Sequence, residues 1–344
     1  MMPNPGHKPP GSGDRAHRPA ILSQQKKVAN WDEIAPPAPI TSPLVLPQVT
    51  DDELQRYADL VYRKTGIRIS PQKKTLLSNR LRRRLRETGI SSYSEYYDYL
   101  TKLPSRHPEW DAFLQEITTH ETYLFRDELQ WQWFRKKFLA EVANRQRGPM
   151  KTLRIWSAAC STGDEAFTAA CCIAAELPDL ASWRITILGT DIGLGAVEQA
   201  RTATFGERAM RLVPDDLKRR FFEKLPNAEV WRAKPILTQM TTFRQHNLMD
   251  PLPERPFDLI FLKNVLIYFD VGSKKVVLNN VLKVLQPGGY LVVGAAEGIG
   301  DLLSEMTRLQ PWLYQKPQES GTRLLAAGSS QSQGSFRAPL DLKR

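Results

Sequence analysis

The sequence predicts an α/β fold in which a doubly wound, mostly parallel sheet follows a small all-α domain. Two observations predict it. Between about residues 50 and 145, apolar side chains recur at helical spacing behind capping residues. Between residues 153 and 295, four short apolar runs alternate with helical segments, a pattern typical of a mostly parallel sheet with helices on its faces.

Capping residues and glycines mark five helices in the first half. Thr50 and Glu53 form a capping box, as do Ser92 and Glu95, and Pro71 stands at a favourable first helical position. We expect helices to start at Thr50, Ser70, Ser92, Glu109 and Asp127, and the first two to end at Gly66 and Gly89.

The second half changes to short buried strands. The apolar runs are LRIWSAA (153–159), RITILGT (184–190), FDLIFLK (257–263) and GYLVVGA (289–295). The helical segments between them are 164–176, 194–202 and 273–285. Gln286-Pro-Gly-Gly289 predicts a helix end and a turn before the last of these strands.

Composition shifts indicate the domain boundaries. Residues 1–47 are rich in proline and small polar residues and lack apolar periodicity, which predicts a disordered leader. Residues 317–344 predict a flexible tail. Between them we expect a helical domain over 48–125 and an α/β domain over 126–316.

Composition also excludes several classes of protein. No apolar run approaches the roughly 18 residues of a membrane-spanning helix, and the N-terminus has no apolar stretch like that of a secretory signal. Cys160, Cys171 and Cys172 have neither the number nor the spacing of a disulfide framework or a zinc site. We expect a cytoplasmic protein without membrane insertion or bound metal.

A net charge of +11 and a pI near 9.5 indicate an acidic partner. Residues 68–86 contain eight basic residues and no acidic one. If Leu77, Leu81 and Leu85 face the core, Arg84 lies near the apolar edge and is expected to pair with a carboxylate or extend to water. The arginines opposite or flanking the apolar stripe are Arg80, Arg82, Arg83 and Arg86.

These arginines form either a docking surface for an acidic protein or an ordinary solvated basic face. A nucleic-acid partner is not expected, because the segment lacks the interleaved aromatic residues used for base stacking. The chain also shows no zinc-finger or helix-turn-helix signature.

The first strand runs into Ser157-Ala-Ala-Cys-Ser-Thr-Gly-Asp-Glu165, where an open α/β sheet presents its ligand crevice. The loop lacks G-x-G-x-x-G, and Asp164 and Glu165 would repel a pyrophosphate. Carboxylates here suit a ligand with cationic groups and ribose hydroxyls, such as S-adenosylmethionine. The alternative is an ordinary helix start with acidic residues at its N-terminus.

Polar side chains also follow two other strands. Asp191 is placed either to accept hydrogen bonds from ribose hydroxyls or to cap the helix that begins near Leu194. Asn264 could bond the polar atoms of a ligand through its amide. Tyr268 could orient a substrate carboxylate, or it could be a half-buried aromatic of the core.

Five segments together resemble the chemotaxis receptor glutamate O-methyltransferases, the CheR type. They are ITTHETYLFR, IWSAACSTGDE, TDI, DLIFLKNVLIYFD and LQPGGYLVVGAAE, in the order of the family's motifs. The resemblance covers roughly residues 50–315. It implies a class I, Rossmann-like methyltransferase that uses S-adenosylmethionine to esterify glutamate side chains of chemoreceptor helices, with an N-terminal helical domain that docks the receptor.

The resemblance also implies roles for individual residues. The cofactor contacts would be Thr122, Arg126, Glu165, Asp191, Asn247, Leu248, Asn264 and Val265. Arg126 and Tyr268 would lie nearest the transferred methyl group, with Arg126 holding the carboxylate of the cofactor rather than that of the substrate. His120 stands where the family usually has Asn, and we expect a structural role for it.

The sequence departs from the family pattern at residues 164–167, 262–264 and 294–297. These departures motivate two alternatives: a non-catalytic adaptor that binds S-adenosylmethionine or its product, S-adenosylhomocysteine, and a methyltransferase for another acceptor. The family carries a small antiparallel insertion, here around 205–245, which can bind a receptor's C-terminal tail through a Gly-rich turn. Residues 221–231 contain no glycine, so we expect no such tether, and we expect a monomer.

Overall fold

The computed structural model describes residues 47–145, 151–226 and 228–318. The expected leader (1–47) and tail (317–344) lie almost entirely outside these residues. Within the described ranges, none of the helices has the length and apolarity that crossing a bilayer would require. The elements from α1 to β10 belong to one compact unit.

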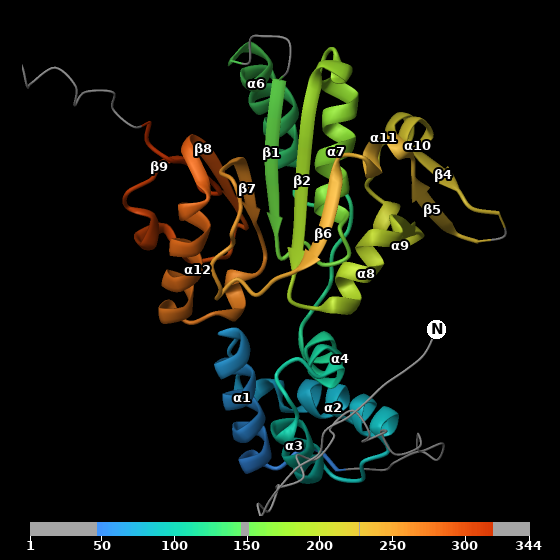
Figure 1. Ribbon diagram of the computed structural model, residues 1–344, viewed down its shortest axis with the longest axis vertical. Helices are drawn as coiled ribbons and strands as arrows, with labels where there is room; N and C mark the ends of the chain where they lie inside the picture. The colour runs from blue at the N-terminus through green and yellow to red at the C-terminus, as the bar shows by residue number, and fades with distance from the viewer. Residues whose placement is uncertain (1–46, 146–150, 227, 319–344) are drawn as a thin grey trace, which may run out of the picture. The chain divides into compact units, whose positions relative to one another are not determined.

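The N-terminal part is helical, as expected, and appears in blue to teal in Figure 1. The capping box at Thr50 is formed in both directions, and α1 ends at Gly66, whose φ of 73° favours glycine. A 3₁₀ turn at Pro71 precedes the second helix, so that helix starts a few residues later than predicted. The elements are α1 (Asp51–Thr65), η2 (Pro71–Lys73), α2 (Lys74–Thr88), α3 (Tyr93–Lys102) and α4 (Pro108–Ile117).

A seven-stranded sheet forms the second part, in the order β6-β2-β1-β7-β8-β10-β9. Neighbours from β6 to β8 run parallel, and only β10 and β9 are added antiparallel. The strands are β1 (Lys151–Ala158), β2 (Trp183–Asp191), β6 (Thr241–Gln245), β7 (Phe257–Leu262), β8 (Leu285–Val293), β9 (Thr307–Gln310) and β10 (Leu313–Gln315). The predicted mostly parallel α/β fold with a preceding all-α part is confirmed.

Helices cover both faces of this sheet, so its strands are apolar on both sides. Phe261 packs into the core under α5 to α7, whereas its neighbours Ile260 and Leu262 pack into the core under α12. The covering elements are α5 (Glu128–Trp133), η3 (Phe134–Phe138), α6 (Leu139–Arg145), α7 (Asp164–Glu176), α8 (Leu194–Thr202) and α12 (Val271–Lys283). Short 3₁₀ turns are η4 (Leu180–Ser182), η5 (Leu266–Tyr268) and η6 (Gly300–Leu303).

Residues 286–289, predicted as a turn before the last strand, belong to that strand. β8 already begins at Leu285, and the pairing with β7 shifts between Phe257–Leu285 and Leu259–Tyr290. The Pro-Gly-Gly segment is therefore an irregularity inside the strand, with Gly288 at φ 74°. The helix before it, α12, ends at Lys283.

A small antiparallel sheet of order β3-β5-β4 interrupts the chain between α8 and β6. Its elements are β3 (Thr204–Gly206), α9 (Glu207–Met210), α10 (Asp215–Phe221), β4 (Phe222–Lys224), β5 (Val230–Ala233) and α11 (Pro235–Thr238). β6 falls inside the expected range of the insertion but pairs with β2, so it belongs to the main sheet.

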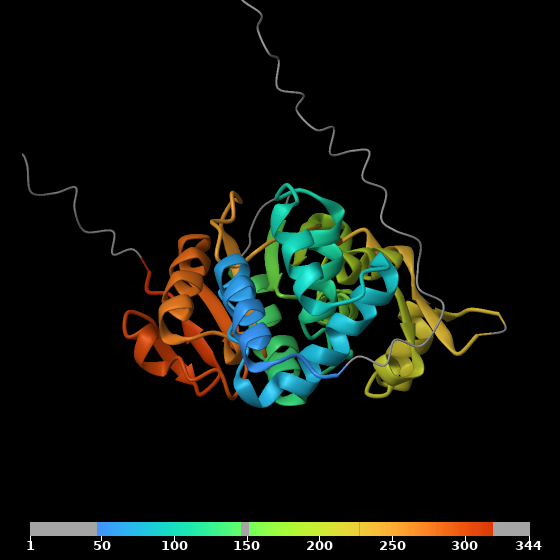
Figure 2. The same ribbon diagram turned by 90° about the horizontal axis from the view of Figure 1, so that it is seen from below.

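The helical part contacts the loops at the carboxyl ends of the parallel strands. Ile67 pairs with Phe269 in an isolated β-bridge, and the main-chain N–H of Arg68 donates to the carbonyl oxygen of Tyr268 at 2.8 Å. In the view from below, helices α1 to α4 lie in front of this edge of the sheet (Figure 2). The two parts meet at the edge where an α/β sheet binds ligands.

Candidate functional site

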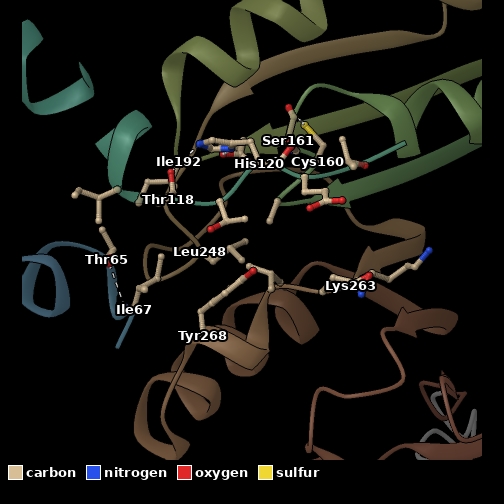
Figure 3. Close-up of a pocket in the computed structure, with 18 of the residues that line it drawn as sticks. Thr65, Ile67, Thr118, His120, Cys160, Ser161, Ile192, Leu248, Lys263 and Tyr268 are labelled. Carbon is tan, nitrogen blue, oxygen red and sulfur yellow. Dashed lines mark hydrogen bonds and ion pairs between the residues drawn. The ribbon is translucent and has the colours of Figure 1, made fainter. Parts of the chain in front are cut away.

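One pocket lies at this edge, between the tips of four neighbouring strands and the N-terminal helices (Figure 3). The strands are β6, β2, β1 and β7, and polar side chains were predicted at the ends of the last three of these. The predicted residues that line the pocket are Thr122, Arg126, Glu165, Asp191, Asn247, Leu248, Asn264, Val265, Tyr268 and Arg80. Predicted positions that are far apart in the sequence are thus brought together.

The loop after β1 reaches the pocket through a tight left-handed turn. Ala159, Ser161 and Gly163 all have positive φ, of 58°, 51° and 87°. A Cβ on Gly163 would lie 2.9 Å from the Cβ of Ala200, so the turn requires glycine at this point. The turn delivers Glu165 to the first turn of α7, facing the pocket.

Glu165 is held from two sides. Its Oε1 accepts a hydrogen bond from the Ser157 hydroxyl at 2.7 Å, and its Oε2 lies 3.4 Å from Nζ of Lys263. Burial raises the pKa of Glu165, although the nearby ammonium of Lys263 opposes this shift. The carboxylate is therefore a positioned anionic acceptor rather than a free side chain.

Asp191 accepts two main-chain hydrogen bonds. Its Oδ2 accepts the N–H of Ser161 at 2.8 Å, and its Oδ1 accepts the N–H of Gly193 at 2.9 Å. The alternative of a helix cap is not what forms, because Gly193 is the N-cap of α8, and the N–H of Ala196 in the first turn of that helix is accepted by Gln115 at 3.0 Å rather than by Asp191. Each carboxylate oxygen of Asp191 keeps a further lone pair for a ligand in the pocket.

The side-chain amide of Asn247 is bonded to two other segments of the chain. Its Nδ2 donates to the carbonyl oxygen of Lys64 at 2.9 Å, and its Oδ1 accepts the N–H of Met249 at 3.1 Å. The side chain thus connects the end of α1 to the loop after β6. Each amide atom already makes one hydrogen bond to the protein, and Asn247 lines the pocket next to the apolar side chain of Leu248.

The buried carboxylate of Glu297 accepts hydrogen bonds from the turn after β7. Asn264 has φ 58°, and its main-chain N–H donates to Glu297, which also accepts the N–H of Ile267 at 3.1 Å. Burial raises the pKa of Glu297, and the main-chain hydrogen bonds oppose that shift. This support places Tyr268 at the pocket wall, with Nζ of Lys73 5.1 Å from the centre of its ring.

Thr122 and Arg126 lie on the segment between α4 and α5. Arg126 donates to the carbonyl oxygen of Glu121 at 3.4 Å, and its guanidinium carbon is 5.7 Å from the centre of the Tyr123 ring. Among the described residues, Arg126 has no salt-bridge partner. Its charge is therefore available to a carboxylate in the pocket.

The pocket suits an adenosyl amino acid. Acidic side chains at the strand tips can accept hydroxyl and ammonium donors, Arg126 can hold a carboxylate, and Ile192 and Leu248 offer apolar surface for a base. Two carboxylates, Glu165 and Asp191, stand where a phosphate site would present bare N–H groups. The described residues contain no group of acidic, His and Cys side chains that could hold a metal ion.

Comparison with known proteins agrees with this geometry. The family model for the SAM-binding domain of CheR methyltransferases matches residues 120–311, and the model for their all-alpha domain matches residues 52–118. The chain belongs to the CheR methyltransferase family. A chemotaxis protein methyltransferase of Borreliella burgdorferi is 31% identical over 73% of this chain and 89% of its own length.

Two further relatives of this CheR-family chain have similar identity. Chemotaxis protein methyltransferase 2 of Pseudomonas aeruginosa is 33% identical over 72% of the chain and 87% of its own length. The chemotaxis protein methyltransferase of Escherichia coli is 31% identical over 75% of the chain and 88% of its own length. The chain is therefore a methyltransferase of chemotaxis with S-adenosylmethionine as its cofactor, and the comparisons give no support to the non-catalytic adaptor.

One site residue of this CheR-family protein was missed by sequence reasoning. The side chain of Lys263 is only 4% exposed, and its Nζ lies 3.2 Å from Asp127 and 3.4 Å from Glu165. It also lies 5.4 Å from the centre of the Trp131 ring. A lysine directly after a predominantly apolar strand could have indicated this arrangement, since a buried cation requires partners.

The arginines of α2 do not form one free ridge. Arg80 turns into the pocket wall, where it donates to the carbonyl oxygen of Ile117 and to the Thr119 hydroxyl at 2.9 Å. Arg82 is partly buried and donates to Asn79 at 2.7 Å. The face predicted as one basic surface is therefore divided, because the helix packs along both of its edges.

Only the centre of that face is exposed. Arg83 pairs with Glu116 at 3.1 Å, and Arg86 is exposed beside it. Arg84 is buried and pairs with Glu109 at 2.8 Å, one of the two outcomes expected for it. In this CheR chain the basic surface on the outside of α2 thus consists of Arg83 and Arg86.

Proposed function

We propose that this protein transfers the methyl group of S-adenosylmethionine to glutamate side chains on an acidic, helical chemoreceptor, giving glutamate methyl esters. One observation carries the proposal. The pocket that gathers the acidic strand tips also contains three cations from the helical part, Arg68, Lys73 and Arg80, on the side of Tyr268. The pocket thus has a side with acidic strand tips, where the cofactor would bind, and a side with cations, which suits an anionic acceptor.

The cofactor half of the proposal assigns the ligand contacts. Glu165 would accept the ammonium of the methionine moiety, Asp191 the ribose hydroxyls, and Arg126 the carboxylate. Thr122 and Asn264 would supply further polar contacts, while the remaining proposed contacts would come from Asn247, Leu248 and Val265. When bound, the cofactor supplies a methyl group activated by its sulfonium.

The chain's own residues have little proton chemistry to perform. A glutamate with an ordinary pKa near 4.3 is already ionised at neutral pH and needs no general base. The protein has to hold the carboxylate in line with the methyl group and exclude water from it. We assign orientation of the acceptor to the Tyr268 hydroxyl and to Arg80, with Arg126 nearest the transferred group.

Docking of the acceptor would use the exposed arginines of α2. Arg83 and Arg86 lie on the same helix as Arg80, which lines the pocket. Each ester removes one negative charge from the receptor, so attraction should weaken as methylation proceeds, and added salt should weaken it as well.

Further parts of the proposal concern the setting of the reaction. The hairpin of β4 and β5 has no glycine in residues 221–231, which supports activity without a peptide tether. Cys160, Cys171 and Cys172 are free and buried, which is compatible with a reducing cytoplasm. We propose that the protein acts as a monomer without nucleic acid.

Transfer of a radiolabelled methyl group to a receptor fragment tests the proposal. Labelled product that is released by mild base identifies a carboxylate ester. Label that resists base would identify another acceptor group and overturn the proposed substrate. A receptor fragment with its glutamates changed to glutamine serves as the matched control and should remain unlabelled.

A further inference from the structure

His120 lies in the pocket wall, near Ser161 of the loop after β1 (Figure 3). Its side chain is 14% exposed, and its Nδ1 is 3.6 Å from Oδ1 of Asp191. Its Nε2 lies 2.7 Å from the hydroxyl oxygen of Thr118. The loop after β1 is also bonded to His120, since the Ser161 hydroxyl donates to the carbonyl oxygen of His120 at 2.7 Å.

These contacts determine which ring nitrogen carries the proton. The Thr118 hydroxyl donates its single proton to the carbonyl oxygen of Leu114 at 2.6 Å. Nε2 of His120 must therefore be the donor in its contact with Thr118, and in the neutral ring Nδ1 remains an acceptor. Burial lowers the pKa of His120, so the ring is neutral at neutral pH.

Two acceptors consequently stand side by side in the pocket, Nδ1 of His120 and Oδ1 of Asp191. At 3.6 Å they make no hydrogen bond to each other. A vicinal diol carries two donors on adjacent carbons and fits such a pair. The ribose of the cofactor is a vicinal diol, and this step rests on the placement of the ribose at Asp191 under the proposed function.

We propose that His120 is a second acceptor for the ribose diol, beside Asp191, and that protonation of His120 weakens cofactor binding. A proton on Nδ1 turns that atom into a donor toward Asp191. The resulting imidazolium–carboxylate pair then takes up Nδ1 of His120 and the free lone pair of Oδ1, and leaves the diol with Oδ2 of Asp191 as its acceptor at this point. An asparagine at this position would not titrate, so the proton linkage belongs to this chain.

The charged groups around the ring act in opposite directions. Asp191 at the end of β2 and Glu116 on α4 favour the imidazolium, whereas burial and Arg80 on α2 disfavour it. The ring packs closely against Gly193, where a Cβ would lie 2.6 Å from its Cε1 and 2.8 Å from its Nε2, so this approach requires glycine. The contact of Nε2 with Thr118 keeps Nδ1 on the side of Asp191.

Calorimetric titration of the full chain with S-adenosylhomocysteine between about pH 5 and pH 7.5 tests the proposal. Below the pKa of His120, the Kd of the wild type should rise by about tenfold for each pH unit, and binding should release a proton. Proton release is read from two buffers of different ionisation enthalpy. In His120→Asn, the pH dependence of Kd and the proton release should both be smaller. Any remainder would come from Glu165, whose pKa is raised by burial.

His107→Asn is the matched control. Nδ1 of His107 accepts the N–H of Glu109 at 3.1 Å at the start of α4, a cap that asparagine can also provide. This variant should keep the wild-type pH profile. Parallel profiles for the wild type and His120→Asn would overturn the proposal.

A second measurement covers the case in which His120→Asn does not fold. The imidazole of His120 in the wild type is titrated by NMR, without cofactor and with S-adenosylhomocysteine. The pKa of the ring should fall further on binding, and an unchanged or raised value would overturn the proposal. Unchanged affinity in Asp191→Asn would instead reject the placement of the ribose under the proposed function.

Discussion

Oε2 of Glu297 accepts the main-chain N–H of Ile267 at 3.1 Å, which ties the loop after β8 to the turn that carries Tyr268. Glu297 is only 1% exposed, and its other oxygen accepts the N–H of Asn264. Its side chain thus supports two residues of the proposed site without facing the pocket.

Glu297→Ala should therefore impair both stability and methyl transfer. It leaves buried N–H groups unpaired, which costs about 1–3 kcal/mol of unfolding free energy for each group. Urea denaturation and methyl-transfer rates measure the two effects. Glu305→Ala, an exposed glutamate on the same segment, should change neither.

Asp191→Asn should weaken cofactor binding. Replacing a carboxylate acceptor by an amide removes charge-assisted hydrogen bonds worth about 1.5–3 kcal/mol, or roughly 10- to 150-fold in Kd. Calorimetry with S-adenosylhomocysteine near neutral pH measures the change. The exposed Asp179 provides the comparison, because its replacement by asparagine should leave Kd unaltered.

Lys263→Met should destabilise the fold. It leaves the carboxylates of Asp127 and Glu165 without their shared cation, and removing one partner of a buried ion pair costs about 3–5 kcal/mol. Since Asp127 is partly exposed, we expect the lower end of this range. Lys275→Met on the outside of α12 is the control, and equal unfolding free energies in the two variants would contradict the prediction.

Charge reversal at Arg83 and Arg86 should slow methylation of an acidic receptor fragment at low salt and leave the Kd of the cofactor unchanged. The difference from the wild type should disappear at high salt, because exposed charges are screened there. Arg106→Glu, a reversal on the exposed loop before α4, tests whether the effect depends on position. A loss of cofactor binding would show that this face of α2 has a structural role instead.

Acid should destabilise the protein below about pH 6.5, the ordinary pKa of histidine. Burial lowers the pKa of both His120 and His246, so these two side chains bind more protons in the unfolded chain than in the folded one below that pH; Glu165 and Glu297, whose pKa values burial raises, act in the opposite direction at lower pH. Unfolding free energy then falls as pH falls. Urea denaturation across this range should show a smaller fall in His246→Asn than in the wild type, and an equal fall would count against the shift at His246.

Much of the fold could be predicted because local signals agreed with the tertiary structure. The helices over 164–176 and 194–202 have the bounds expected from the sequence, and Gly66 ends α1 as predicted. The prediction of a turn at Pro-Gly-Gly was wrong because glycine at positive φ occurs at strand irregularities as well as at turns. Only the pairing with β7 distinguishes the two.

The site was predicted less completely, for a physical reason. Strand ends indicate which residues meet, so Glu165, Asp191 and Asn264 could be placed together in advance. A side chain's hydrogen-bond partners come from distant segments, and spacing does not reveal them. Asn247 is thus bonded to Lys64, and the partners of Arg80 lie beyond α4.

The links between the helical part and the strand loops have a consequence for chimeric proteins. Ile67 is bridged to Phe269, Lys64 to Asn247, and the side-chain oxygen of Gln115 to the N–H of Ala196. A transplanted set of α1 to α4 from a relative would need the matching loops as well. Receptor preference and cofactor affinity are therefore expected to be inherited together rather than as interchangeable modules.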